Sequence, residues 1–296
     1  MSDQIVQDLW NDRSGWSATA DRLRSNRMRW RAVALLFTIA GAALQTLAAA
    51  FGHPKSAIAA VGFILLAFVP FVTARFLTPE QTRKWLRARS VSEGMKSEIF
   101  WYRAGADPYD GPDALDKLRR KIQEIQSWGQ GLEMERVRVT APPSQAPRAL
   151  DADGYLQRRV YQQVSAYYRP KAKFNAMRAS QFQWAETALA GVAALVGAYA
   201  SFSGSTSFGP WVAVLTTGTG SISAHAAVSR YDFQATTFFA TARQLEDLAH
   251  QWQLSGKSAP SKEWSEFVRA CEEAISAENR GWMAKLDQNE TRATGN

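Results

Sequence analysis

The sequence predicts an all-α membrane protein with two transmembrane helical hairpins, and therefore four spans, continuous with a cytoplasmic helical bundle or coiled coil. Two observations lead to this prediction. Two apolar regions, 32–74 and 187–228, are each long enough to cross a membrane twice, and the polar segments around them repeat their apolar residues at helical spacing. No segment has the alternating pattern that is typical of a strand.

The first apolar region contains the more hydrophobic hairpin. Its first run, about 32–51, carries no charge, and at 1.5 Å per residue it covers a hydrocarbon core of about 30 Å. A short turn, 52–56, leads to a second uncharged run, about 57–74. A turn this short predicts an antiparallel pair of spans.

The second apolar region is more polar. Its spans, about 187–202 and 210–228, are separated by an uncharged loop, and in the last span Gly, Ser, Thr and Ala replace most of the large apolar residues. The last span is therefore poorly suited to facing lipid alone, and we expect function to reside there.

The formal net charge of +8 is concentrated beside the spans. Arginines and lysines precede and follow each hairpin, whereas the turn of the first hairpin contains only Lys55 and the loop of the second contains none. By the positive-inside rule, both termini and the central segment lie in the cytoplasm. Acidic residues are interspersed with these cations, so their position favours a lipid bilayer as the partner and argues against nucleic acid.

The sequence contains little that indicates catalysis. It has one cysteine, Cys271, so no intramolecular disulfide is available, and its three histidines are scattered. A phosphate-binding glycine loop, paired cysteines and His-Glu metal spacing are all missing from the sequence. We therefore expect no enzyme activity, no cofactor and no metal.

The chain divides into two similar units. Residues 1–138 form the first two-transmembrane unit, 139–150 is a linker with three prolines, and 151–296 forms the second unit. Each unit has a basic helix with scattered aromatic residues, a hairpin that opens near a tryptophan, and a helix with seven-residue spacing. This order predicts a duplicated architecture.

The helices that follow the hairpins carry apolar residues at heptad spacing, which is typical of close helix pairing. We predict that these residues form an oligomerisation seam, which leads to a homo-oligomer. In the first unit the seam comprises Trp85, Met95, Ile99 and Tyr102, and in the second unit it comprises Tyr231, Phe238, Leu245 and Trp252.

The last span carries one polar face. Thr217, Ser221 and His225 are four residues apart, so they lie on the same side of a helix, and a polar face in a membrane must meet protein or water. The face either lines an aqueous pore or packs against another helix, with Gly220 and Ala224 allowing close approach. A carbonyl filter over 217–220 is disfavoured, because it needs a re-entrant loop that this hairpin lacks.

Two other spans offer partners for this face. On span three, Ala190, Ala194 and Ala198 form a matching small surface for helix packing. On span one, Thr38 and Gln45 form a thinner polar stripe, which either joins the same pore or pairs across its own hairpin.

Two motifs carry a resemblance to a known family. YLQRRVYQQVSAYYRPKAKFN, residues 155–175, resembles the entry helix of the SLATT family, the two-transmembrane effector domains associated with SMODS nucleotidyltransferases and SLOG sensors. RARSVSEGMKSEIFWYRAGADPY, residues 87–109, is similar to a segment of a second SLATT subtype, which indicates a tandem of two such domains. Pro170 departs from the pattern and predicts a kink in the entry helix.

This resemblance implies a function. The family is bacterial, so the expected location is the inner (plasma) membrane, and the implied role is a pore-forming effector of antiviral defence. The implied trigger is a nucleotide second messenger or a sensor protein. We therefore expect the chain to oligomerise into an ion-permeable channel that is gated through its cytoplasmic helices. The alternative is a membrane-anchored scaffold or sensor that recruits cytoplasmic partners without conducting ions.

Overall fold

The computed structural model describes residues 2–50, 55–139, 144–204 and 208–277. Every regular element within these residues is helical. The residues outside these ranges include most of the turn 52–56, part of the linker 139–150, part of the loop 203–209 and residues 278–296.

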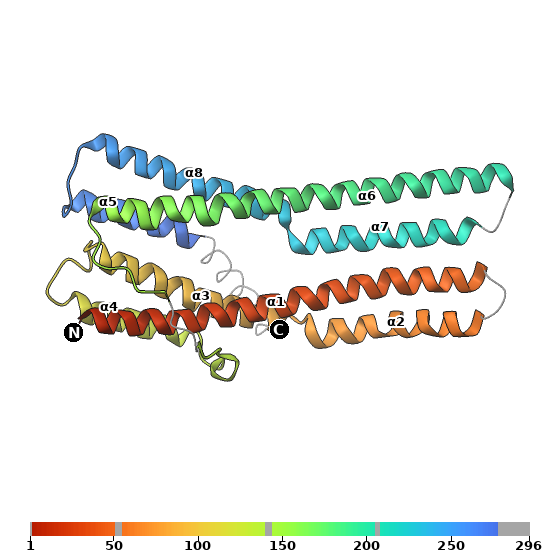
Figure 1. Cartoon of the computed structure of the whole chain (residues 1–296), viewed down its shortest axis with the longest axis horizontal. Coiled ribbons are helices and arrows are strands. Elements are labelled where there is room, and N and C mark those ends of the chain that lie inside the picture. Colours follow the sequence, from red (N-terminus) through yellow and green to blue (C-terminus); the bar gives the residue numbers. More distant parts are fainter. Residues whose placement is uncertain (1, 51–54, 140–143, 205–207, 278–296) are drawn as a thin grey trace, which may run out of the picture. The chain divides into compact units, whose positions relative to one another are not determined.

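Helices α1 (Ser2–Ala50) and α2 (Lys55–Phe76) form the first hairpin and run antiparallel (Figure 1). The two helices approach closely at two glycines. A Cβ atom on Gly41 would lie 2.7 Å from Cγ of Leu66, and a Cβ atom on Gly62 would lie 3.0 Å from Cβ of Leu44. A larger residue at Gly41 would force Leu66 to move, and one at Gly62 would crowd Leu44, so both glycines favour this helix spacing.

Helices α6 (Arg169–Ser203) and α7 (Gly209–Ser229) form the second hairpin (Figure 1). Here the contact is looser, because a Cβ atom on Gly218 would lie 3.8 Å from Leu189 and one on Gly197 would lie 3.8 Å from Val212. By length and composition, α1, α2 and the helix that contains α6 can cross a membrane. Helix α7 is not among these helices, so the fourth span stays a prediction.

The remaining long helices are polar. They are α3 (Pro79–Arg103), α4 (Ala114–Ser127), α8 (Tyr231–Ser255) and a helix over 262–277, with a short 3₁₀ turn at Glu133–Glu135. At the start of α3, the amide of Gln81 donates to Oγ1 of Thr78 over 3.3 Å. Threonine followed by proline at the first helical position is typical of a helix start, and this bond caps the helix.

The entry to α6 contains two π-helical stretches. Helix α5 (Ala152–Tyr155) begins at Asp151, whose side chain accepts from the Gly154 amide over 2.8 Å, and is followed by π turns at Leu156–Tyr161 and Val164–Tyr168. The helix then continues through Pro170 to Ser203. Because proline cannot donate a backbone hydrogen bond and its ring crowds the carbonyl four residues earlier, a widened turn just before it relieves both problems.

The chain folds into two compact units that do not follow the order of the sequence. Unit 1 comprises Met1–Arg24, Thr82–Ala172 and Thr236–Asn296, and unit 2 comprises Ser25–Gln81 and Lys173–Ala235. Unit 2 therefore holds both hairpins, and unit 1 holds the polar helices. Each spatial unit takes residues from both predicted halves, and the division into 1–138 and 151–296 stays a prediction about the order of the sequence.

The heptad faces pack within the chain. Met95 and Ile99 are fully buried in one apolar cluster of unit 1 together with Val6 and Leu118. Phe238, Leu245 and Trp252 belong to a second cluster of unit 1, whereas Trp85 and Tyr102 are partly buried against the first. Within the described residues these side chains therefore pack against helices of the same chain, and 3.5-residue spacing does not distinguish such a neighbour from a second copy. A seam between copies stays a prediction.

Candidate functional site

Unit 2 contains a pocket of about 380 Å³ between α1, α2 and α7. Most of its wall is apolar, and a few polar groups from the three helices converge on it. Its lining residues are Arg31, Ala34, Leu35, Thr38, Thr73, Leu77, Ser221, Ala224, His225 and Val228. A mostly apolar pocket with a few convergent polar groups is the usual form of a binding or transport site.

The threonine hydroxyls in this pocket already donate within their own helices. Oγ1 of Thr38 donates to the Ala34 carbonyl over 2.9 Å, and Oγ1 of Thr73 donates to the Val69 carbonyl over 2.8 Å. Their hydroxyl oxygens keep acceptor capacity, so they can accept from a donor inside the pocket. Arg31 supplies a permanent cation at one wall.

Aromatic rings support His225. The ring centroid of Phe182, on α6, lies 5.3 Å from that of His225, and Phe182 stacks on Tyr231 with centroids 5.5 Å apart and planes inclined by 10°. The imidazole is therefore placed by a contact between the two helices of the second hairpin. The same imidazole lines the pocket.

The structure brings together three of the residues that the sequence indicated as pore-lining. Thr38 of span one lies in the same pocket as Ser221 and His225 of span four. Thr217 is exposed and does not line this pocket. Gln45 is also elsewhere, because its Nε2 donates to the Ala59 carbonyl across the first hairpin over 2.8 Å. The two alternatives for the stripe of span one therefore apply to different residues: Gln45 pairs across the hairpin, and Thr38 faces the pocket.

The predicted small-residue contact between spans three and four does not form within the chain. Ala190, Ala194 and Ala198 are exposed, and a Cβ atom on Gly220 would meet open space. Ala224 lines the pocket. The second hairpin instead packs through Gly197 and Gly218, because α7 is rotated so that its Gly218 side faces α6.

Sequence reasoning missed Arg31 and Thr73 as pocket residues. Arg31 belongs to the basic residues that precede the first hairpin, but Arg31, Leu35 and Thr38 are four and three residues apart and so lie on one face of α1. Thr73 carried no signal of its own, since a single threonine at the end of an apolar span is common.

A second polar site lies buried in unit 1, around the carboxylate of Glu272. Its Oε1 accepts from Nε of Arg159 over 2.7 Å and from the Tyr155 hydroxyl over 2.9 Å, and its Oε2 accepts from Ser97 Oγ over 2.6 Å. Arg159 and Glu272 are each 1% exposed. This carboxylate therefore joins α3, the π-helical entry segment and the helix over 262–277.

The charges in this region perturb one another. Burial lowers the pKa of Arg159, but the adjacent Glu272 carboxylate more than reverses this effect, so the pKa is raised overall. Burial and the positive charge of Arg159 lower the pKa of Lys96 to about 8. Burial also raises the pKa of the Cys271 thiol, which is fully buried, so its thiol is poorly reactive.

Sequence reasoning also missed Glu272. The signal was present, because Trp264, Val268 and Glu272 are four residues apart, which places an acidic residue on the apolar face of the last helix. Within the described residues, no group of three or more His, Cys, Asp or Glu side chains is arranged to hold a metal ion.

Helices of membrane length together with this pocket define a helical membrane protein. The particular family follows from residues 155–282, which match the model of the SMODS and SLOG-associating 2TM effector domain 1, so the chain carries a SLATT domain. Residues 14–117 match a second model, which describes a protein family of unknown function, DUF4231. Comparison with curated proteins and with solved structures finds no match. The resemblance to the SLATT family is confirmed, and it implies a membrane effector of a defence or conflict system.

Proposed function

We propose that the protein is an effector that oligomerises in the membrane and forms an ion-permeable pore. The single observation that carries the proposal is the convergence of Thr38, Ser221 and His225 on one pocket within unit 2. Polar side chains inside a membrane are costly unless they meet protein or water, and sites where they converge commonly mark a permeation pathway.

An exposed face of α7 supports assembly of several copies. Thr216, Thr217, Gly220, Ser223 and Ala224 are exposed and recur at spacings of three and four, so they share one side of the helix. Small residues on one side let a second helix approach closely, whereas lipid chains make few van der Waals contacts with them. Four spans per chain are few for a channel, so we expect copies to contribute α7 to a shared axis.

Gly220→Ile tests this assembly in a single variant. Because a Cβ atom on Gly220 meets nothing within one chain, the added side chain has room in the monomer and clashes only with a second copy. The matched control is Gly191→Ile on α6, where a Cβ atom also meets nothing within 4 Å. Cross-linking in liposomes and release of a trapped ion measure assembly and conduction in the same samples.

We expect the wild type and Gly191→Ile to cross-link into a closed oligomer and to release ions as the protein-to-lipid ratio rises. Gly220→Ile should remain monomeric and should not release ions. Absence of any ion release from the wild type, at every ratio at which the oligomer is present, would reject the pore. That outcome would favour the membrane-anchored scaffold or sensor, whose spans only hold the cytoplasmic helices in place.

The trigger proposed for this pore acts on unit 1, which contains the polar helices and which the positive-inside rule assigns to the cytoplasm. A nucleotide second messenger or a sensor protein would bind there and change the packing of those helices. Differential binding to the closed and open arrangements would then raise the open fraction of the pore above the basal fraction that the liposome assay detects without a trigger.

A further inference from the structure

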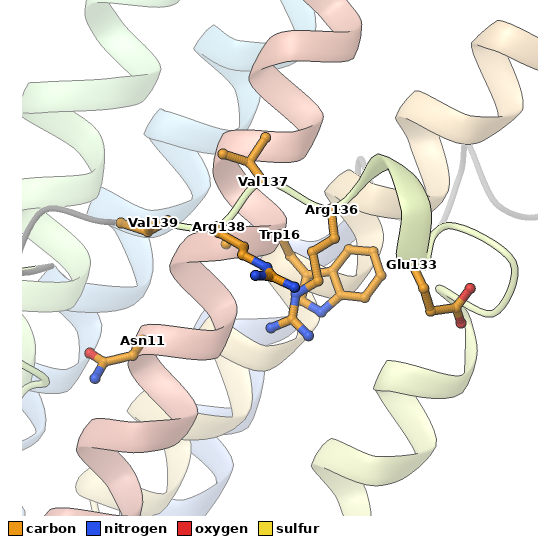
Figure 2. Close-up of a pocket in the computed structure, with 8 residues that line it drawn as sticks. Asn11, Trp16, Glu133, Arg136, Val137, Arg138 and Val139 are labelled. Carbon is orange, nitrogen blue, oxygen red and sulfur yellow. The ribbon is translucent and has the colours of Figure 1, made fainter.

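Unit 1 contains a second pocket, of about 540 Å³, that neither the sequence motifs nor the pore uses. It lies between α1 and the extended segment that follows the 3₁₀ turn, and Figure 2 shows its lining side chains. The lining residues are Asn11, Gly15, Trp16, Glu133, Arg136, Val137, Arg138 and Val139.

Trp16 forms the buried part of the pocket and leaves one donor unpaired. The residue is only 5% exposed, yet its Nε1–H has no hydrogen-bond partner among the described residues. A buried N–H without an acceptor is unfavourable, so an acceptor supplied by a ligand would be favoured here. Gly129 makes room for the indole, because a Cβ atom on Gly129 would lie 2.5 Å from Cη2 of Trp16.

Two arginines from the extended segment lie beside this indole. The guanidinium of Arg136 lies 5.4 Å from the Trp16 ring centroid, and Arg138 lines the same pocket (Figure 2). Arg136 pairs with Asp12, whereas Arg138 forms no ion pair with the other described residues that line the pocket. The carboxylate of Glu133 accepts from the Gly131 amide over 3.1 Å and points away from the guanidinium groups (Figure 2). The guanidinium side of the pocket therefore has an excess of positive charge.

The backbone of this segment is fixed against α1. The Val137 amide donates to Oγ1 of Thr19 over 2.9 Å, and Thr19 is fully buried. Gly15 permits the close approach, because a Cβ atom on it would lie 3.2 Å from the Val137 carbonyl oxygen. The two arginines are thus held on an ordered segment, which reduces the entropy lost when a ligand binds.

We propose that this pocket binds a soluble phosphate-bearing small molecule, with Arg136 and Arg138 contacting the phosphate and the Trp16 indole N–H donating to one phosphate oxygen. A phosphate group offers several acceptor oxygens and negative charge, which two guanidinium groups and one N–H complement. The volume of the pocket leaves space for an organic group attached to the phosphate. The site is separate from the pore and can be tested without any measurement of ion flux.

Calorimetry on the full-length protein in detergent tests the proposal with three probes: inorganic phosphate, adenosine monophosphate and adenosine. We expect both phosphate-containing probes to bind and adenosine to show no binding. Arg138→Gln and Trp16→Phe should each weaken binding of adenosine monophosphate by about tenfold, because each removes one hydrogen bond to a charged group. Arg148→Gln, which changes an exposed arginine of the same connecting segment outside the pocket, is the matched control and should bind as the wild type does.

Thermal unfolding of each variant separates loss of binding from loss of fold. Arg138 is exposed, so Arg138→Gln is expected to fold normally even if a change at the buried Trp16 does not. Failure of both phosphate-containing probes to bind the wild type at millimolar concentration would overturn the proposal. Equal binding of adenosine and adenosine monophosphate, or unchanged affinity in folded Arg138→Gln, would overturn it as well.

Discussion

Arg159 and Glu272 are 113 positions apart in the chain and form an ion pair in which each side chain is 1% exposed. The same carboxylate also accepts from Tyr155 and Ser97, so three separate segments of unit 1 depend on one buried charge. A buried charge that loses its partner is strongly destabilising, whereas replacement of both partners by apolar groups is often tolerated.

We therefore predict that Glu272→Leu lowers the free energy of unfolding by about 3–5 kcal/mol, because Arg159 remains charged and buried without its partner. The double variant Arg159→Met with Glu272→Leu should recover part of this loss. Recovery is partial because the Tyr155 and Ser97 hydroxyls still lack their acceptor. Chemical unfolding in detergent, followed by tryptophan fluorescence, measures both effects.

The exposed pair Lys262 and Glu266 is the control for this experiment. Its atoms are 3.9 Å apart and both side chains are largely exposed, so Glu266→Gln should change the free energy of unfolding by less than about 0.5 kcal/mol. If the double variant loses as much stability as the single variants Arg159→Met and Glu272→Leu together, the two side chains do not stabilise each other.

Ser221→Leu should reduce ion release from liposomes, because it places a large apolar side chain in the pocket that Thr38 and His225 also line. The matched control is Ser201→Leu on α6, where an exposed serine donates to the Gly197 carbonyl over 3.0 Å. We expect Ser201→Leu to conduct as the wild type does. Equal conduction by Ser221→Leu at equal oligomer content would argue against a permeation pathway through this pocket.

The stability of unit 1 should rise between about pH 8 and about pH 10, because burial lowers the pKa of Lys96 from 10.5 to about 8. In this range the unfolded chain holds a proton on Lys96 that the folded chain has already released. The unfolded state therefore binds more protons, and the free energy of unfolding increases with pH.

Lys96→Met should lack this increase, and it should be more stable than the wild type near neutral pH, where the buried ammonium is a cost. Unfolding curves at several pH values give the difference in free energy of unfolding between the two proteins. Contributions from titrating groups that both proteins share cancel in this difference. Parallel pH profiles would mean that Lys96 does not titrate in this range.

Gly41→Ala should destabilise the first hairpin by about 1–3 kcal/mol, because the new Cβ atom would lie 2.7 Å from Cγ of Leu66. Gly191→Ala introduces the same methyl group on α6, where nothing lies within 4 Å, and should be neutral or slightly stabilising through higher helix propensity. Thermal unfolding followed by circular dichroism compares the two variants. A loss of similar size in both would assign the effect to the helix backbone, and the close contact at Leu66 would then have no role.

The sequence indicated most of the fold because its signals are local. Uncharged runs of membrane length, basic flanks and the Thr78-Pro79 start signal each depend on residues that are close together in the chain, and the described elements are all helical. The motif at residues 155–175 likewise identified the SLATT domain, which the family match confirms.

The candidate site was only partly predictable. Helical spacing placed Ser221 and His225 on one face of span four, but it could not decide which neighbour that face meets. The same limit applied to Met95 and Leu245, whose heptad spacing predicted a seam between copies although both are buried within the chain. The π turns before Pro170 were not predicted either, because backbone adjustments of this kind have no simple sequence pattern.

By itself, the sequence determined that this protein is helical, that its hairpins are of membrane length and that it carries a SLATT domain, because periodicity, hydropathy and motifs are properties of adjacent residues. Only the tertiary structure decided that Thr38 lines one pocket with Ser221 and His225, that the Glu272 carboxylate joins three segments, and that two arginines line the pocket of the unpaired Trp16 indole N–H. These relationships depend on how helices distant in the chain rotate and pack, and that rotation is set by contacts such as Gly41 against Leu66 which no local pattern specifies.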